Sequence, residues 1–193
     1  MSAQFDSQRT FEKPSDFALW LAQNHNTAPE LWVKIYKKSA QQPSITWEEA
    51  VMEALCWGWI DGIKKSLDDA AYLQRFTPRR KGSLWSRVNT QHVERLIAEK
   101  RMQAPGMQTV QEAQSNGNWE RAYASMRDMT IPEDFLRALE AIPNGKSVFE
   151  ALSRQHKYQI YFGLHTAKMA KTREKRKNTF LNQIAEAANN QQS

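Results

Sequence analysis

The chain has very little cysteine, and its single thiol, Cys56, excludes an internal disulfide. One cysteine in 193 residues also fits a reducing compartment. Long hydrophobic runs are missing too, because no apolar stretch approaches the roughly 20 residues that span a bilayer. The first residues, Met-Ser-Ala-Gln-Phe-Asp-Ser, have neither the basic start nor the apolar centre of a signal peptide. We therefore expect a soluble, cytoplasmic protein.

The chain also lacks the short motifs that identify a reaction. His156 and His165 would fall on opposite sides of a helix, whereas a metal pair on a helix needs a spacing of three or four. Cys56 lies between apolar residues at the end of a predicted helix, where a thiolate is disfavoured. No Gly-x-Ser-x-Gly motif surrounds Ser83 or Ser86. We expect no catalytic residue, no metal and no cofactor.

Charge and apolar content are ordinary for a globular protein, with 40% hydrophobic and 25% charged residues. A chain of this length buries roughly 70% of the surface that its unfolded form exposes, so its core needs no disulfide. The net charge of +6 favours anionic partners. An anionic small molecule or a protein is therefore the partner that we consider first, and the oligomeric state stays open.

Helix and strand signals alternate near the start of the chain. Pro14 is tolerated in the first turn of a helix, and it begins an amphipathic segment that ends near Asn24. Residues 30–38 alternate aliphatic side chains with aromatic and basic ones, which predicts a half-buried strand. Thr46 opens a capping box with the glutamate three residues later, and the helix that it starts is expected to stop at Gly58.

A β-hairpin is expected next. Residues 59–66 and 72–77 have the pattern of two strands, joined by a polar turn at Asp68-Asp69. Pro78 ends the second strand, so the Pro-Arg-Arg-Lys loop leaves the sheet there. The side chains of a strand alternate with a period of two. This places four residues of the first strand and of the segment just before it on one face: Trp57, Trp59, Asp61 and Ile63.

From about residue 89 onward the hydrophobic spacing is helical, with breaks at residues 105–106, 116–117 and 143–145, and residues 119–129 are amphipathic as well. The apolar residues expected to face the core there include Val93, Leu96, Ile97, Phe135, Leu136 and Leu139. We predict an α+β fold, predominantly helical, with a small antiparallel sheet containing a β-hairpin. The expected domains are an N-terminal α+β domain over 1–128 with the Trp-Gly-Trp-Ile-Asp-Gly hairpin, and a C-terminal helical segment over 129–193 packing on it.

Asp61 is the most informative residue of the hairpin. A carboxylate on a face shared with tryptophans is partly desolvated, which raises its pKa unless a cation or backbone amides hold it. Arg79, Arg80 or a residue of the C-terminal helices could supply that cation through a bidentate pair. Alternatively, the acid and the glycine after it make a bulge or turn, and the carboxylate bonds to nearby amides. Both interpretations stay open.

The C-terminal basic run also allows two interpretations. If this run continues as a helix, Arg173 and Lys177 fall within the same arc of roughly 80° around the helix axis as the apolar side chains that face inward. Either these cations overhang the core and lie in water, or Arg173, with Arg176, docks on residues 58–62 and pairs with Asp61.

Nucleic-acid binding is a separate alternative for the basic C-terminal helix and the Pro-Arg-Arg-Lys loop. Their cations would neutralise phosphates, and Trp85 or Trp119 would stack on bases. The residues concerned are Arg79, Arg80, Lys81, Lys171, Arg173, Lys175, Arg176 and Lys177.

Several segments together suggest a family. They are Leu55-Cys-Trp-Gly-Trp-Ile-Asp-Gly62, Arg75-Phe-Thr-Pro-Arg-Arg80, Ser83-Leu-Trp-Ser-Arg-Val-Asn89, Gly106, Gly117-Asn-Trp119, Ala167-Lys168, Thr172-Arg173 and Arg176. From about Trp32 to Ile184 the chain resembles the bacterial YdeI/OmpD-associated family, also called bacteriocin-protection proteins. The resemblance implies a role in tolerance of bacteriocins, antimicrobial peptides or related stress, with no assigned reaction and no cofactor. Family descriptions lean towards the cell envelope, whereas this sequence has no recognisable export signal.

Three functional hypotheses follow. The first is a non-enzymatic stress-tolerance protein with a binding face rich in Trp, Asp and Arg. The second is nucleic-acid binding, and the third is an enzyme or sensor of a small anionic ligand in a concave site. The residues expected to bind a ligand are Trp57, Trp59, Asp61, Arg79, Arg80, Trp85, Ser86, Arg173 and Arg176.

Overall fold

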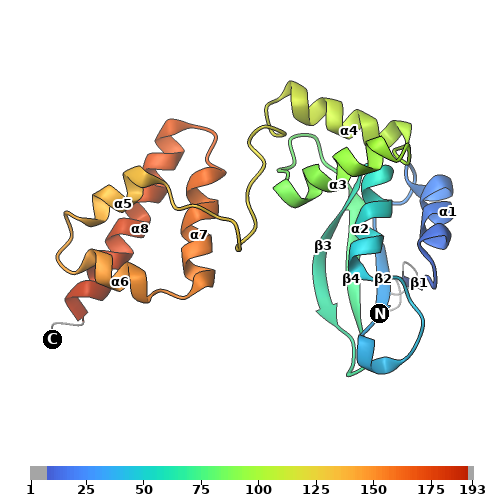
Figure 1. The fold of residues 1–193 in the computed structure, drawn as a ribbon, viewed down its shortest axis with the longest axis horizontal. Coiled ribbons are helices and arrows are strands. Elements are labelled where there is room, and N and C mark those ends of the chain that lie inside the picture. The colour runs from blue at the N-terminus through green and yellow to red at the C-terminus, as the bar shows by residue number, and fades with distance from the viewer. Residues whose placement is uncertain (1–7, 191–193) are drawn as a thin grey trace. The chain divides into compact units, whose positions relative to one another are not determined.

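A computed structural model describes residues 8–190 of the chain. The chain divides into two compact units. Among the described residues, the first unit combines residues 8–83 with 89–119, and the second combines residues 84–88 with 120–190. Figure 1 labels the helices and strands of both units.

The first unit contains a four-stranded sheet with the order β1-β2-β4-β3. Its strands are β1 (Gln8–Thr10), β2 (Leu31–Tyr36), β3 (Trp59–Ser66) and β4 (Ala71–Pro78). The predicted strand and hairpin pair antiparallel, but β1 adds a parallel pair to β2, so the sheet is mixed. The α+β fold class is confirmed, and the parallel edge strand was not predicted.

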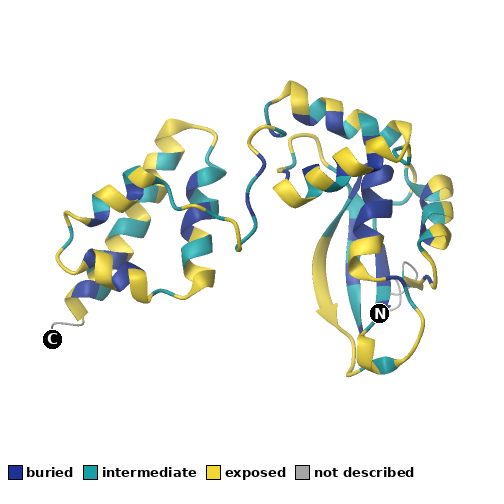
Figure 2. Cartoon of the chain, viewed as in Figure 1, coloured by how far each residue is buried: buried dark blue, intermediate teal, exposed yellow. Residues whose placement is uncertain are grey.

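Two helices, α1 (Pro14–Asn24) and α2 (Trp47–Cys56), cover one face of this sheet. Ring contacts tie α1 to that face: Phe17 meets Phe76 with centroids 5.5 Å apart, and Trp20 meets Trp59 edge-on at 5.6 Å. The predicted capping box starts α2, because the Thr46 hydroxyl accepts from the amide of Glu49. In Figure 2, α2 is buried over most of its length, whereas most of β3 is exposed. A 3₁₀ turn, η1 (Lys38–Ala40), follows β2.

The β3–β4 hairpin is interrupted by a bulge. Asp61 pairs with Phe76, but the next regular pair is Lys64 with Gln74, so two residues of β3 oppose one residue of β4. The bulge reverses the alternation of side chains, and Asp61 and Lys64 therefore face the same side of the sheet. The predicted position of Ile63 on this face is wrong, and its side chain is 58% exposed.

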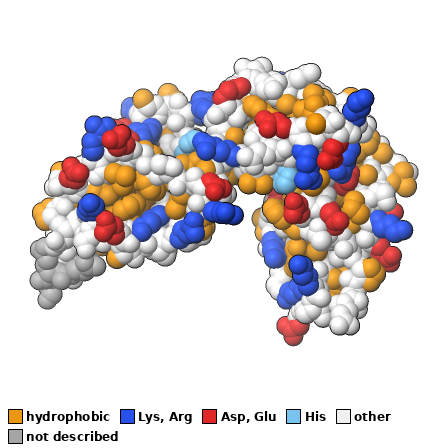
Figure 3. All heavy atoms as spheres, in the orientation of Figure 1, with side chains coloured by type: hydrophobic (Ala, Val, Ile, Leu, Met, Phe, Trp, Pro, Cys, Tyr) orange, Lys and Arg blue, Asp and Glu red, His pale blue; other side chains and the backbone are white. Residues whose placement is uncertain are grey.

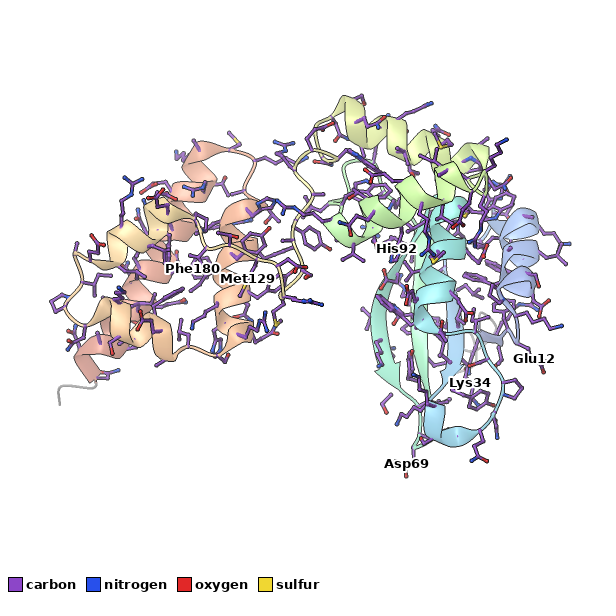
Figure 4. The ribbon with its side chains drawn as sticks, viewed as in Figure 1. Glu12, Lys34, Asp69, His92, Met129 and Phe180 are labelled. Carbon is purple, nitrogen blue, oxygen red and sulfur yellow. The ribbon has the colours of Figure 1, made fainter. Side chains whose placement is uncertain are left out.

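The hairpin turn is held by a side chain. An oxygen of the Asp68 carboxylate accepts from the amides of Ala70 and Ala71 at 2.8 and 2.7 Å. These amides lower the pKa of Asp68, since they favour its charged form. Asp69, labelled in Figure 4, lies beside it at the tip of the hairpin. The polar turn at the two aspartates is confirmed.

The helix α4 (Ala104–Ser115) and the helix α3 (Arg87–Ala98), from residue 89 onward, complete the first unit. Val93 and Leu96 are fully buried as predicted, but Ile97 is 42% exposed, because it lies at the edge of the apolar stripe. Gly106 in the first turn of α4 lies against the end of α2, where an added Cβ would be 2.2 Å from the carbonyl oxygen of Cys56. Only glycine allows this close approach of the two helices.

The second unit is a small helical bundle of α5 (Glu133–Leu139), α6 (Gly145–Ala151), α7 (Arg154–His165) and α8 (Ala170–Asn190). Phe135 and Leu139 are buried in its core, but Leu136 is 40% exposed and the prediction for it is wrong. Phe180, labelled in Figure 4, lies against Gly163 of α7. Figure 3 shows further hydrophobic side chains at the surface of these helices. The amphipathic segment 119–129 forms turns instead of a helix.

Candidate functional site

The carboxylate of Asp61 is held by a side chain of the neighbouring helix. The indole Nε1 of Trp47 donates a hydrogen bond to Oδ2 of Asp61 over 3.1 Å. Burial raises the pKa of Asp61 above its ordinary value, although the Trp47 hydrogen bond and the positive charge of Arg79 act in the opposite direction. Desolvation therefore outweighs the attractive contacts that Asp61 makes within the chain.

A shallow pocket of about 270 Å³ lies next to this hydrogen bond, and we call it the hairpin pocket. Trp47, Lys64, Tyr72 and Gln74 line it. The ammonium Nζ of Lys64 lies 3.9 Å from the centroid of the Tyr72 ring, which is a cation–π contact. Burial raises the pKa of the Tyr72 phenol.

The buried amide of Gln74 fixes the floor of the pocket to the bulge. Gln74 is only 3% exposed, and its Nε2 donates to the carbonyl oxygen of Gly62 over 3.0 Å. A buried amide of this kind costs stability unless it is bonded, so the bond fixes the course of β3 where it departs from regular pairing. The bulge thereby holds Lys64 beside Tyr72.

Local sequence rules explain why these side chains meet. The capping box makes Trp47 the first residue of α2. Its ring therefore lies at the N-terminal end of the helix, where it is 42% exposed. The bulge then brings Asp61 and Lys64, which are three residues apart, to the same face of the sheet. A cation, two aromatic rings and an amide thus line one concave surface, and the Asp61 carboxylate is bonded to one of these rings. Such an arrangement can bind a small polar group.

The two tryptophans predicted to form the binding face lie elsewhere in the first unit. Trp59 is 1% exposed, and its Nε1 donates to the carbonyl oxygen of His25 over 3.0 Å. Trp57 caps the end of α2 and packs on the imidazole of His25, with ring centroids 4.8 Å apart. Both rings are therefore engaged around the end of α1. Asp61, by contrast, contacts Trp47, which lines the hairpin pocket.

The Pro-Arg-Arg-Lys loop begins where β4 ends. The amide of Arg79 donates to the carbonyl oxygen of Gly58 over 2.9 Å, which holds the loop against the end of α2. Arg80 and Lys81 are exposed. Of these three residues, Arg79 is the one whose charge acts on Asp61.

Trp85 and Ser86 belong to the second unit. Trp85 is 2% exposed, and its carbonyl oxygen accepts from the amide of Tyr123. Ser86 forms a parallel bridge with Tyr123. The Trp85 ring is therefore a buried side chain rather than a surface for stacking.

Arg173 pairs with an acid that the sequence analysis did not consider. Its two terminal nitrogens donate to the two oxygens of Asp134 in α5, each over 2.8 Å. This bidentate pair holds the pKa of Asp134 well below its usual range. The predicted pairing of Arg173 with Asp61 is therefore wrong, because each has a different hydrogen-bonding partner.

Other predicted cations of α8 also have partners in the second unit. Lys177 reaches Oδ2 of Asp134 over 3.4 Å, and Arg176 donates to the carbonyl oxygen of Gly163 over 2.8 Å. Lys171 and Lys175 are exposed. Of the α8 cations that the nucleic-acid alternative requires, Arg173, Arg176 and Lys177 have partners within the unit, and Lys171 and Lys175 are exposed.

Sequence reasoning missed Trp47, Lys64, Tyr72 and Gln74 as site residues. The sequence does contain a signal for Trp47, because a large aromatic residue directly after an N-cap residue lies at the N-terminal end of a helix. The sequence contains no such signal for Lys64, since a regular strand would place it on the opposite face from Asp61.

Among residues 8–190 there is no group of three or more His, Cys, Asp and Glu side chains that could hold a metal ion. No helix in this described range is both long and apolar enough to cross a membrane.

Two family models match the chain. Residues 9–109, more than half of the chain, match the family described as Domain of unknown function (DUF8412). Residues 128–187 match the family described as Bacteriocin-protection, YdeI or OmpD-Associated. The family resemblance is thus confirmed over the C-terminal part, while the hairpin residues that helped to suggest it lie within the other range. No curated protein and no solved structure matches the chain.

Proposed function

Because the chain belongs to the DUF8412 family over residues 9–109 and is of the bacteriocin-protection, YdeI or OmpD-Associated type over residues 128–187, we propose that it protects bacteria by binding bacteriocins or antimicrobial peptides. The family match supports the protective role. The hairpin pocket supports binding as the means, and we assign it as the binding site.

The observation that carries this assignment is the contact of Trp47 with Asp61 beside the pocket. Exposed tryptophan in a concave surface is typical of binding sites, because its ring buries a large area at little cost in conformational entropy. A partly desolvated acid beside it offers a specific polar contact. These two features distinguish the hairpin pocket from the groove of about 160 Å³ between α6, α7 and α8, which is lined by aliphatic side chains, Phe180, His156 and two glutamines.

We further propose that the protein acts in the cytoplasm and without catalysing a reaction. The one thiol in the chain supports the second point. Burial raises the pKa of Cys56 to about 11, so the thiolate that would act as a nucleophile is scarce near neutral pH. Cell fractionation followed by immunoblotting tests the first point, and recovery of the protein outside the cytoplasmic fraction would refute it.

Deletion of the gene tests the protective role. We expect the deletion strain to survive less well than its parent when both are exposed to a panel of bacteriocins and antimicrobial peptides. Growth without peptide serves as the control for a general defect. Equal survival of the two strains across the panel would overturn the proposed function.

A further inference from the structure

We propose that the hairpin pocket recognises a cation, namely the ammonium or guanidinium group of a lysine or arginine side chain in a basic peptide. This inference rests on the proposed function in taking the pocket as its binding site, and it adds the chemical class of the ligand. A small anionic ligand is one of the alternatives that the sequence left open, and it has the opposite charge.

The aromatic rings provide the first argument. The faces of Trp and Tyr rings carry negative electrostatic potential and attract cations, and sites for quaternary ammonium groups are built from such rings. Trp47 and Tyr72 line the same pocket from α2 and β4. The ammonium of Lys64 already lies 3.9 Å from the centroid of Tyr72, so the chain itself places a cation on this ring.

Asp61 provides the second argument. Its Oδ2 accepts from the indole of Trp47, so the acid lies behind one of the rings that line the pocket and is bonded to it. Burial keeps the pKa of Asp61 raised in spite of that hydrogen bond and of the charge on Arg79. A cation bound nearby would favour the charged form of the carboxylate, and this gain contributes to binding.

Lys64 is therefore an internal competitor for the ligand. Lys64 is exposed on β3, and a flexible lysine side chain can leave the Tyr72 ring when another cation arrives. Removing the Lys64 charge should strengthen the binding of a cation. For an anionic ligand the same change should weaken binding, so the sign of the effect separates the two alternatives.

The chain offers a matched control in Lys65. Its ammonium lies 4.7 Å from the centroid of Trp32, which is also a cation–π contact. Lys65 pairs with Leu73 and so faces the opposite side of the sheet from Lys64, which pairs with Gln74. Lys65→Met removes the same charge from the same strand without touching the hairpin pocket.

The experiment is a titration of the full chain with two cationic probes, tetramethylammonium and the amide of acetyl-lysine, and with phosphate as the anionic comparison. Binding is followed by NMR of the tryptophan indole N–H signals. The Trp47 signal is identified from its loss in the Trp47→Phe variant. We expect both probes to shift this signal. Lys64→Met should tighten binding by about threefold and Asp61→Asn should weaken it by about fivefold, whereas Lys65→Met should leave the Kd unchanged.

Three results would overturn the inference: no shift of the Trp47 signal with either probe, weaker binding in Lys64→Met, or a shift with phosphate that Lys64→Met abolishes. Lys64 is exposed, so its substitution tests the proposal even where Asp61→Asn fails to fold. If the cationic probes do not bind but the deletion strain is more sensitive to peptides than its parent, only the ligand class is refuted. Cation binding without any protective effect would refute the proposed function.

Discussion

The indole of Trp47 donates a hydrogen bond to the carboxylate of Asp61, and this bond joins the first residue of α2 to the strand β3. It gives Asp61 a partner within the first unit. The acid nevertheless keeps a raised pKa, because burial has the larger effect. The folded protein is therefore less stable with Asp61 charged than with Asp61 protonated.

The pH dependence of stability should reveal Asp61. Its folded pKa lies above the unfolded value of about 3.9, so its contribution to stability is fully present below that pH and is lost as the pH rises through the folded pKa. We expect the stability of the natural protein to fall relative to Asp61→Asn over this window. Urea unfolding of both proteins, followed from below the unfolded pKa of about 3.9 up to neutral pH, measures the difference. A constant difference would contradict the raised pKa.

The opposite dependence is expected for Asp134 in the second unit. Arg173 lowers its folded pKa, so the contribution of the pair is present above the unfolded value of about 3.9 and is lost as the pH falls through the folded pKa. Both side chains are about one third exposed, so Arg173→Ala should cost only about 1 kcal/mol.

Lys175→Ala is the matched control for Arg173→Ala, because Lys175 is exposed on the same helix. We expect that change to cost less than about 0.5 kcal/mol. Equal urea midpoints for the two variants would show that the ion pair with Asp134 contributes nothing measurable.

The contact of α4 with the end of α2 should be intolerant of any side chain. Gly106→Ala places a methyl group 2.2 Å from the carbonyl oxygen of Cys56, so the helices must separate. We expect a loss of about 3 kcal/mol or failure to fold. Gly62→Ala is the control, since its nearest neighbour would be 3.8 Å away. Thermal unfolding followed by circular dichroism compares the two, and similar midpoints would refute the close contact.

Much of the fold was predictable because its signals are local. The capping box of Thr46 and Glu49, the hairpin turn at Asp68 and the cap of α7 at Ser153 depend on residues within a few positions of each other. The parallel pairing of β1 is a long-range contact between short segments, and three residues carry too little pattern to reveal it.

The site was less predictable, because it depends on one irregularity. Strand periodicity gave the correct face for Trp59 and Asp61 but the wrong one for Ile63, since the bulge reverses the alternation after Asp61. Helical spacing predicted that Arg173 either lies in water or pairs with Asp61, and it gave no indication of Asp134, which is the acid that Arg173 contacts. Charge pairs between distant segments are set by the packing of the helices.

Complementation of the deletion strain tests most directly whether the hairpin pocket carries protection. The strain would receive the natural gene, the double variant Trp47→Ala with Asp61→Asn, or Lys65→Met, each at equal protein level by immunoblot. Under peptide challenge we expect the natural gene and Lys65→Met to restore survival and the double variant to leave the strain sensitive. Full restoration of survival by the double variant would contradict the assignment of the pocket.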